Sequence, residues 1–192
     1  VGDHRVLRLA DGFRIELNTD TVLRLAIADG KRKAWLLKGE AFFHIKHDAT
    51  HAFDVIAGHG RVTDLGTQSL VRQHLDHLEV ALLEGRARID SDEAIGGSQS
   101  AELTPGDVAF ASGGSLTVSK KSTRALMDEA SWRRGVLVFE GVSLAAAVAE
   151  MNRYNTEHLV VAEPAIALRR IDGTFPVHAV RELSDMAQAV FR

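Results

Sequence analysis

The chain has 192 residues, which leaves room for one large domain or two small ones. With 45% hydrophobic and 26% charged residues it is predicted to be a soluble globular protein rather than a disordered chain. The formal net charge of -3 offers no electrostatic reason to expect nucleic acid, and the absence of cysteine excludes disulfides and thiolate metal sites.

From Val6 to Val118 the sequence alternates mostly with a period of two, which is the side-chain period of a β-strand. Turn signals built on glycine and aspartate separate the runs at roughly 8–12-residue intervals, as in sandwiches and solenoids. We predict strands at Ala34–Leu37, Ala41–Ile45, Phe53–Ile56, Arg61–Leu65, Leu78–Leu82 and Ala87–Ile89. The first part of the chain is therefore predicted to be an all-β, repeat-like sandwich or solenoid.

Two blocks in this region resemble each other. Leu36–Ala41 and Leu82–Ala87 both read Leu-Leu-charged-Gly-charged-Ala. Their recurrence suits a fold that stacks similar β elements. A third glycine signal, Pro105-Gly106, predicts a type II turn, because glycine tolerates the positive φ that this turn requires.

The composition changes after Val118. The stretch Ser119–Arg124 is polar and basic, which is typical of a linker. We place an all-β domain at residues 1–118, a linker at 119–131 and a small α+β domain at 132–192. The predicted fold class is therefore mainly β, followed by a short α+β domain.

Residues 132–192 show strand and helix patterns in the order of a split βαβ unit. We predict strands at Val136–Phe139 and His158–Val161, a turn at Asp172–Gly173, and helices that begin after Ser143 and at Glu182. Ser143 is the predicted N-cap of the first helix and Asn155 its C-cap. A domain of about 60 residues buries only about 60% of its chain surface, so we expect it to lean on another domain or on a partner.

The apolar stripe of the first helix consists of Leu144, Val148 and Met151, at positions i, i+4 and i+7. Such a stripe could be a recognition face. We interpret it as packed core, which is the more economical reading of helical apolar spacing.

The histidines are the candidate metal ligands. His44, His47 and His51 lie within eight residues of one another, with Asp48 nearby. On a strand, His44 and His47 point to opposite faces, and no second cluster in the sequence completes four ligands. We interpret them as solvated histidines and predict no metal and no cofactor.

Enzymatic chemistry has little support. The serines of the Gly/Ser loops have no histidine beside them, and the sequence holds no G-x-S-x-G elbow. Leu103–Val108 resembles a turn of cupin barrels, but the cupin His-x-His with a downstream glutamate is absent. We predict no catalytic residues and no enzymatic activity, with a cupin-like metal-dependent protein as an alternative.

Taken in order, these segments resemble the FecR family, the transmembrane regulators of extracytoplasmic-function sigma factors in Gram-negative bacteria. The resemblance rests on an ordered set: Leu17-Asn18-Thr19, Gly39-Glu40-Ala41-Phe42, Phe53-Asp54-Val55, Leu65-Gly66-Thr67, Glu84-Gly85, Pro105-Gly106-Asp107, Trp132-Arg133-Arg134-Gly135 and Asp172-Gly173-Thr174-Phe175. The last segments are similar to the short N-terminal (STN) domain shared by secretins and TonB-dependent transducers.

The resemblance implies a periplasmic signalling region of an anti-sigma factor. The implied partner is the periplasmic signalling domain of a TonB-dependent outer-membrane siderophore receptor, and the signal would pass across the inner membrane to the sigma factor. The chain begins at Val1-Gly2 and ends within a helical pattern. We therefore expect it to be part of a longer single-pass protein whose membrane helix and sigma-binding segment precede Val1.

We expect the partner to dock on the short domain, whose open sheet edges can accept a strand through backbone hydrogen bonds. The candidate partner-binding residues are Val160, Val161, Arg169, Arg170, Ile171 and Phe175. A different class of function stays open, in which the chain is a non-signalling envelope β domain that binds glycan or scaffolds other proteins.

Overall fold

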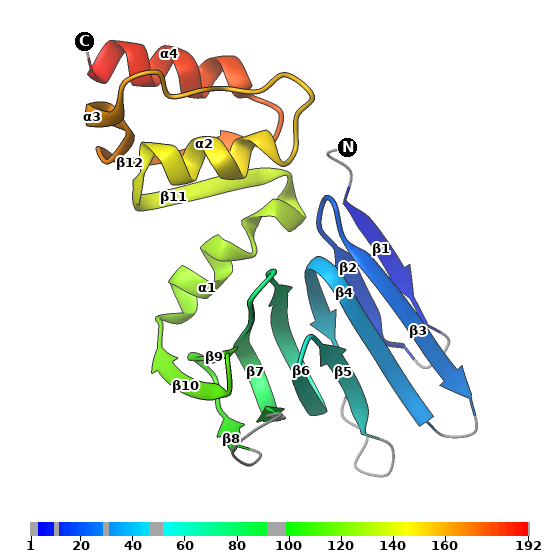
Figure 1. The fold of residues 1–192 in the computed structure, drawn as a ribbon. Coiled ribbons are helices and arrows are strands. Elements are labelled where there is room, and N and C mark those ends of the chain that lie inside the picture. The colour runs from blue at the N-terminus through cyan, green and yellow to red at the C-terminus, as the bar shows by residue number, and fades with distance from the viewer. Residues whose placement is uncertain (1–3, 10–11, 29–30, 47–51, 92–98, 192) are drawn as a thin grey trace. The chain divides into compact units, whose positions relative to one another are not determined.

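The computed structural model describes residues 4–9, 12–28, 31–46, 52–91 and 99–191 (Figure 1). The chain separates into two compact units, which are described one at a time. Arg5–Met127 form the first, here called the β unit; Asp128–Arg192 form the second, the short unit, to which His4 also belongs. The predicted linker, residues 119–131, contains a helix, α1 (Thr123–Glu129).

The β unit is built from antiparallel strands with one parallel pair, β4 with β5. The strands are β1 (Arg5–Arg8), β2 (Arg14–Leu17), β3 (Val22–Ala28), β4 (Lys31–His44), β5 (Phe53–Ala57), β6 (Gly60–Gln73), β7 (His77–Ser91), β8 (Gln99–Leu103), β9 (Asp107–Ser112) and β10 (Ser115–Lys120).

Three long strands, β4, β6 and β7, each take part in two layers. The first half of β4 pairs with β3 and β5. In the second half of the same strand, Gly39–His44 pair with β6, and Ala41–His44 also pair with β2. In the same way β7 pairs with β9 near its start and with β8 near its end. The predicted strands Ala34–Leu37 and Ala41–Ile45 are thus largely one bent strand. Two layers joined by bent strands make a sandwich, which decides between the two predicted all-β architectures.

The two similar sequence blocks mark bends of this kind. Along the β3–β4 ladder Val22 faces Lys38 and Leu23 faces Leu36, so that Leu37 is an extra, unpaired residue. Along the β6–β7 ladder Gln68 faces Glu84 and Ser69 faces Leu82, which leaves Leu83 in the same position. Each bulge is followed two residues later by a glycine with a left-handed backbone, at φ 88° for Gly39 and 87° for Gly85. A bulge bends its strand and increases the local twist, so the repeated block is the sequence signature of a corner.

The core lies between the layers. Phe53 of β5 meets Phe13 and Phe43 of the opposite layer, with ring centroids 5.8 and 6.1 Å away. Branched and small apolar side chains from both layers surround these rings: Ile15, Leu36, Val55, Val62, Val71, Val80, Leu82, Ile89 and Leu103. Burying each large side chain contributes about 1.5–3 kcal/mol, and this burial holds the layers together.

The predicted type II turn at Pro105-Gly106 is confirmed. The Asp107 amide donates to the Thr104 carbonyl at 2.9 Å, and Gly106 has a φ of 90°. These are the hydrogen bond and the positive φ of that turn type.

The short unit holds one antiparallel strand pair and helices. Its elements are η1 (Ser131–Arg134), β11 (Val136–Ser143), α2 (Leu144–Asn152), α3 (Pro164–Ala167), β12 (Arg170–Pro176) and α4 (Val180–Val190). The predicted N-cap is confirmed, since Ser143 Oγ accepts from the Ala146 amide at 3.2 Å. The stripe of Leu144, Val148 and Met151 is buried, as predicted.

Three local predictions for this unit are wrong. His158–Val161 do not form a strand, and Asp172–Gly173 lie inside β12 rather than in a turn. Asn155 is not the C-cap of α2, a position that Arg153 occupies. Asn155 Nδ2 instead donates to the carbonyls of Met151 and Val177, both at 2.8 Å, and so joins the end of α2 to the chain after β12.

Candidate functional site

The segment between α2 and α3 is extended and fixed at one end. The Asn152 side chain clamps the Leu159 backbone, with Oδ1 accepting from its N–H at 2.8 Å and Nδ2 donating to its carbonyl at 2.9 Å. Beyond this clamp, the backbone of Val160–Ala162 forms no hydrogen bond with any residue that the structure describes. The Val160 side chain is 85% exposed. An apolar side chain therefore lies beside three residues of unpaired backbone.

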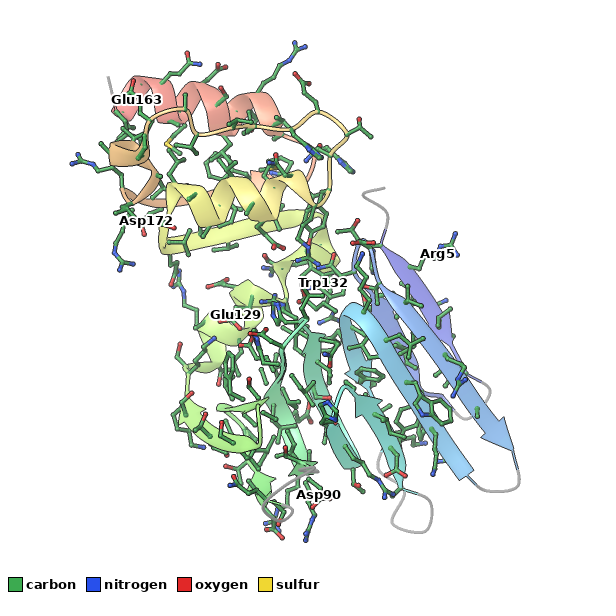
Figure 2. The ribbon with its side chains drawn as sticks, in the orientation of Figure 1. Arg5, Asp90, Glu129, Trp132, Glu163 and Asp172 are labelled. Atoms are coloured by element: carbon green, nitrogen blue, oxygen red, sulfur yellow. The ribbon has the colours of Figure 1, made fainter. Side chains whose placement is uncertain are left out.

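A groove of about 380 Å³ runs along this segment. Its walls come from α2, α3, α4 and the extended segment, which lie together in Figure 1. The lining is mainly apolar: Leu144, Val148, Leu159, Val160, Val161, Ala162, Ile166, Leu183, Ala187 and Phe191. Polar groups are supplied by Glu163, which lies where α3 begins (Figure 2), and by Ser184 and Gln188 of α4.

This arrangement suits recognition rather than catalysis. Apolar side chains of a partner can enter the groove, and the free N–H and C=O groups of Val160–Ala162 can pair with an extended chain. Glu163 adds a carboxylate at the end of the segment, where it can bind a basic or amide side chain of the partner.

Four of the six predicted partner-binding residues line the groove, lie next to a residue that lines it, or are exposed. Val160 and Val161 line the groove. The Arg169 guanidinium lies 5.6 Å from the ring centroid of Phe191, a lining residue. Arg170 is exposed on β12 and donates to the Gly141 carbonyl. Arg169 thus adds positive charge beside a residue that lines the groove.

The other two predicted residues, Ile171 and Phe175, are buried. The Phe175 ring packs against that of Phe139, with centroids 5.9 Å apart, in the small core beside β11 and β12. Sequence reasoning had also missed Ile166 and Phe191 as lining residues. The spacing of Leu183, Ala187 and Phe191 at i, i+4 and i+8 could have indicated the α4 wall.

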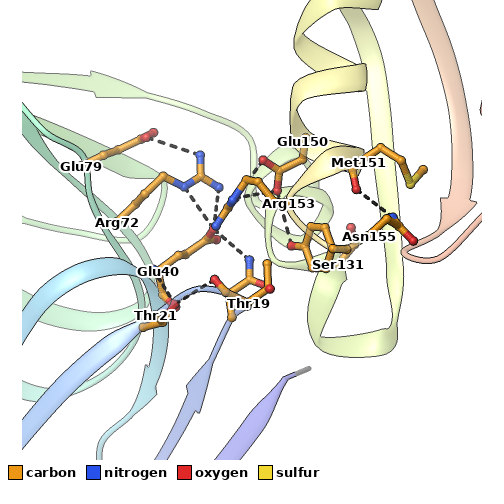
Figure 3. Close-up of polar contacts among 12 residues, drawn as sticks. Thr19, Thr21, Glu40, Arg72, Glu79, Ser131, Glu150, Met151, Arg153 and Asn155 are labelled. Atoms are coloured by element: carbon orange, nitrogen blue, oxygen red, sulfur yellow. Dashed lines mark hydrogen bonds and ion pairs between the residues drawn. The ribbon is translucent and has the colours of Figure 1, made fainter. Parts of the chain in front are cut away.

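The β unit contains a buried ion pair that has no sign of reactivity. Glu40 on β4 receives hydrogen bonds from Arg72 on β6 and from Asn18, and Arg72 also lies 3.8 Å from Glu79 on β7 (Figure 3). Figure 3 also shows a pair within the short unit, in which Arg153 Nη1 lies 2.8 Å from each carboxylate oxygen of Glu150. The first set satisfies the fully buried Glu40 carboxylate, a charge that would otherwise be costly to bury, whereas Arg153 and Glu150 are only partly buried.

A second hollow, of about 510 Å³, lies among the turns that join β5 to β6, β6 to β7 and β9 to β10. His77 is stacked between His74 and Phe110 there, with centroids 4.1 and 5.2 Å away. A hydrogen bond from His77 lowers the pKa of the neighbouring Asp76 carboxyl. The residues that line this hollow include none from our predicted site.

Of the three histidines in the predicted cluster, only His44 is among the described residues. His44 ends β4 and is half-buried, whereas His47 and His51 lie outside the described residues. Across the part of the chain that is described, no three His, Cys, Asp or Glu side chains are grouped so as to hold a metal ion.

Comparisons with known proteins place this geometry in context. Residues 1–88 match the family described as FecR protein. This match makes the first part of the chain similar to FecR proteins and covers a little under half of the chain. FecR is a family of regulatory proteins rather than enzymes, and the match supports a role in signalling. A comparison with curated proteins finds no match.

Two solved structures share the fold over nearly the whole chain. Both are crystal structures of a candidate anti-sigma factor from Parabacteroides distasonis ATCC 8503, at 1.65 and 2.50 Å resolution. Each is 20% identical, with TM-scores of 0.78 and 0.77, and each comparison covers 99% of this chain and 88% of the other. At this identity the likeness shows a common fold that extends past the FecR segment into the short unit.

Among the described helices, none is long and apolar enough to cross a membrane.

Proposed function

We propose that this chain is the periplasmic, signal-receiving region of a cell-surface-signalling sigma-factor regulator. In this proposal it binds the periplasmic signalling domain of a TonB-dependent siderophore transducer. The longer protein relays the binding across the inner membrane to an extracytoplasmic-function sigma factor. The FecR match of residues 1–88 and the fold shared with a candidate anti-sigma factor support this assignment.

The observation that carries the binding role is the groove beside Val160–Ala162. Unpaired backbone is a template for pairing with another chain, and an apolar groove can accept apolar side chains of a partner; here both occur along one segment. The proposed docking surface is Val160 and Val161, with Arg169 and Arg170 as peripheral charged contacts. Ile171 and Phe175 support this surface from the core and do not form part of it.

A capture experiment tests the proposal. The immobilised chain is exposed to outer-membrane extract of the source bacterium grown without iron, beside two variants, Val160→Asp and Leu168→Asp. Both replaced residues are exposed and apolar, at 85% and 80%, but only Val160 lines the groove. We expect one dominant TonB-dependent receptor on the wild type and on Leu168→Asp, and its loss on Val160→Asp. Retention on peptidoglycan without such a receptor would favour an envelope glycan-binding domain instead.

A further inference from the structure

The strand β3 forms an edge of the sandwich. It pairs with β4 along one side and with no other strand among the described residues. Figure 1 shows it at the border of the β unit, beyond β4. Its seven residues, Val-Leu-Arg-Leu-Ala-Ile-Ala, contain no proline, glycine, lysine or acidic residue. A long edge strand of this composition is a template for pairing with another chain.

The other edge strands of the β unit are protected. β1 has only four residues, with arginine at both ends. β8 and β10 contain serines and one charged residue each, Glu102 and Lys120. The Gln99 side chain of β8 accepts from the Leu116 amide of β10 at 2.9 Å, which holds these two edges against each other. Short length, charge and coverage are the usual devices that stop edge pairing. β3 has only one of them, the single charge of Arg24.

The two faces of β3 have different environments. Leu23 and Leu25 are half-buried and pack against the core between the layers. On the opposite face, the Arg24 guanidinium lies 4.4 Å from the ring centroid of Trp35, and Ala26 is exposed. The apolar core therefore reaches the edge of the sandwich, where Ile27 remains half-exposed.

We propose that β3 is a homodimer interface, in which it pairs antiparallel with β3 of a second copy about a two-fold axis at Leu25. This is the register that pairs all seven residues. It sets Leu23 opposite Ile27 of the second copy on the core face, so the apolar row continues across the dimer. On the outer face it sets Arg24 opposite Ala26, so the two guanidinium groups lie on a diagonal rather than directly opposite each other.

The charge pattern of β3 favours a second copy of the chain as its partner, and it favours the register with the two-fold axis at Leu25. An axis at Arg24 would bring two guanidinium groups face to face, which is destabilising. The strand is complementary to itself, since its one charged residue faces the smallest side chain of its outer face. Complementarity of β3 to itself is a property that only a partner strand of the same sequence requires.

Sedimentation equilibrium of the purified chain tests the interface with a pair of substitutions at Ala26. By symmetry each substitution acts twice against the second copy's Arg24. Ala26→Lys should weaken dimerisation by about threefold or more, and Ala26→Glu should strengthen it by a similar factor. The double variant Arg24→Glu/Ala26→Lys restores opposite charges and should dimerise better than Ala26→Lys alone. A chain that stays monomeric at its solubility limit, or a dimer that responds equally to both substitutions, would overturn the proposal.

Because the chain has no cysteine, single introduced thiols give a second readout. Leu25→Cys places two thiols at the two-fold axis and should yield a disulfide-linked dimer under mild oxidation. Val118 lies half-exposed on the β10 edge, and the control variant Val118→Cys should stay monomeric. Equal cross-linking of the two variants would contradict the β3 interface.

Discussion

Nη2 of Arg72 lies 3.0 Å from Oε2 of Glu40, a carboxylate that is fully buried in the β unit. Nε of the same guanidinium and Nδ2 of Asn18 both reach that oxygen at 3.1 Å. Three donor atoms from two residues, Arg72 and Asn18, therefore converge on one acceptor. The pair joins β4 to β6 just after the bulge that bends β4.

This convergence predicts a large effect of removing either charge. Glu40→Ala should lower the free energy of unfolding by about 3 kcal/mol, because it removes the fully buried acceptor of three hydrogen bonds and leaves the partly buried Arg72 and Asn18 donors without it. The double variant Glu40→Leu/Arg72→Met should lose less than the sum of the two single replacements. Urea denaturation followed by circular dichroism measures both.

An exposed ion pair provides the control for this prediction. Arg88 and Asp90 interact at 2.8 Å, but the Arg88 side chain is largely solvated. Arg88→Ala should cost at most about 1 kcal/mol. A cost equal to that of Glu40→Ala would contradict the role assigned to burial.

Gly39 is predicted to be irreplaceable for steric reasons. A Cβ there would lie 2.5 Å from Oγ1 and 2.7 Å from Cα of Thr21, in addition to the strain of its positive φ. Gly39→Ala should therefore destabilise the chain by about 3 kcal/mol or more. Gly12 also has a positive φ, but a Cβ there meets nothing within 4 Å, so Gly12→Ala should cost only about 1 kcal/mol. Thermal unfolding of the two variants separates steric clash from backbone strain.

Asp107 is predicted to make stability depend on pH. Burial by itself would raise the pKa of its carboxyl, but hydrogen bonds from the Thr104 amide and hydroxyl, both at 2.7 Å, together with Lys120, lower that pKa below its ordinary value. A lowered pKa in the folded state contributes stability above the unfolded pKa of about 3.9, and this contribution is lost as the pH falls through the folded pKa.

The measurement for Asp107 is the free energy of unfolding at pH 7 and at pH 3. Asp107→Asn should cost about 1–2 kcal/mol at pH 7 and less at pH 3, because below the unfolded pKa of about 3.9 part of the contribution of the carboxylate is already lost. The exposed Asp185→Asn should change the free energy by less than about 0.5 kcal/mol at pH 7. A constant cost for Asp107→Asn at both pH values would contradict the assigned hydrogen bonds.

Much of the fold could be predicted from local patterns. Alternation with a period of two indicated the strands, and the glycines of Leu36–Ala41 and Leu82–Ala87 indicated a repeated structural element. What alternation could not reveal is that one strand continues through each block into a second layer. The bulges at Leu37 and Leu83 shift the pairing by one residue. Such a shift depends on the neighbouring strand as much as on the sequence of the bulged strand itself.

The candidate site was predictable only in part, for a related reason. The run His158–Val161 has the composition of a strand, but a strand needs a partner ladder, and none forms within the described residues. The same absence of pairing is what makes Val160 a candidate contact. Ile171 and Phe175 have the same apolar character, and only the pairing of β11 with β12 shows that their side chains are buried.

The most direct test of the proposed function is a calorimetric titration of this chain with the purified signalling domain of the receptor that it captures. We predict saturable binding that Val160→Asp weakens tenfold or more, because it places a charge in an apolar groove, and that Leu168→Asp leaves unchanged. Binding of full strength by Val160→Asp would contradict the groove as the docking site. If the wild type does not bind the signalling domain at all, the proposed function is wrong.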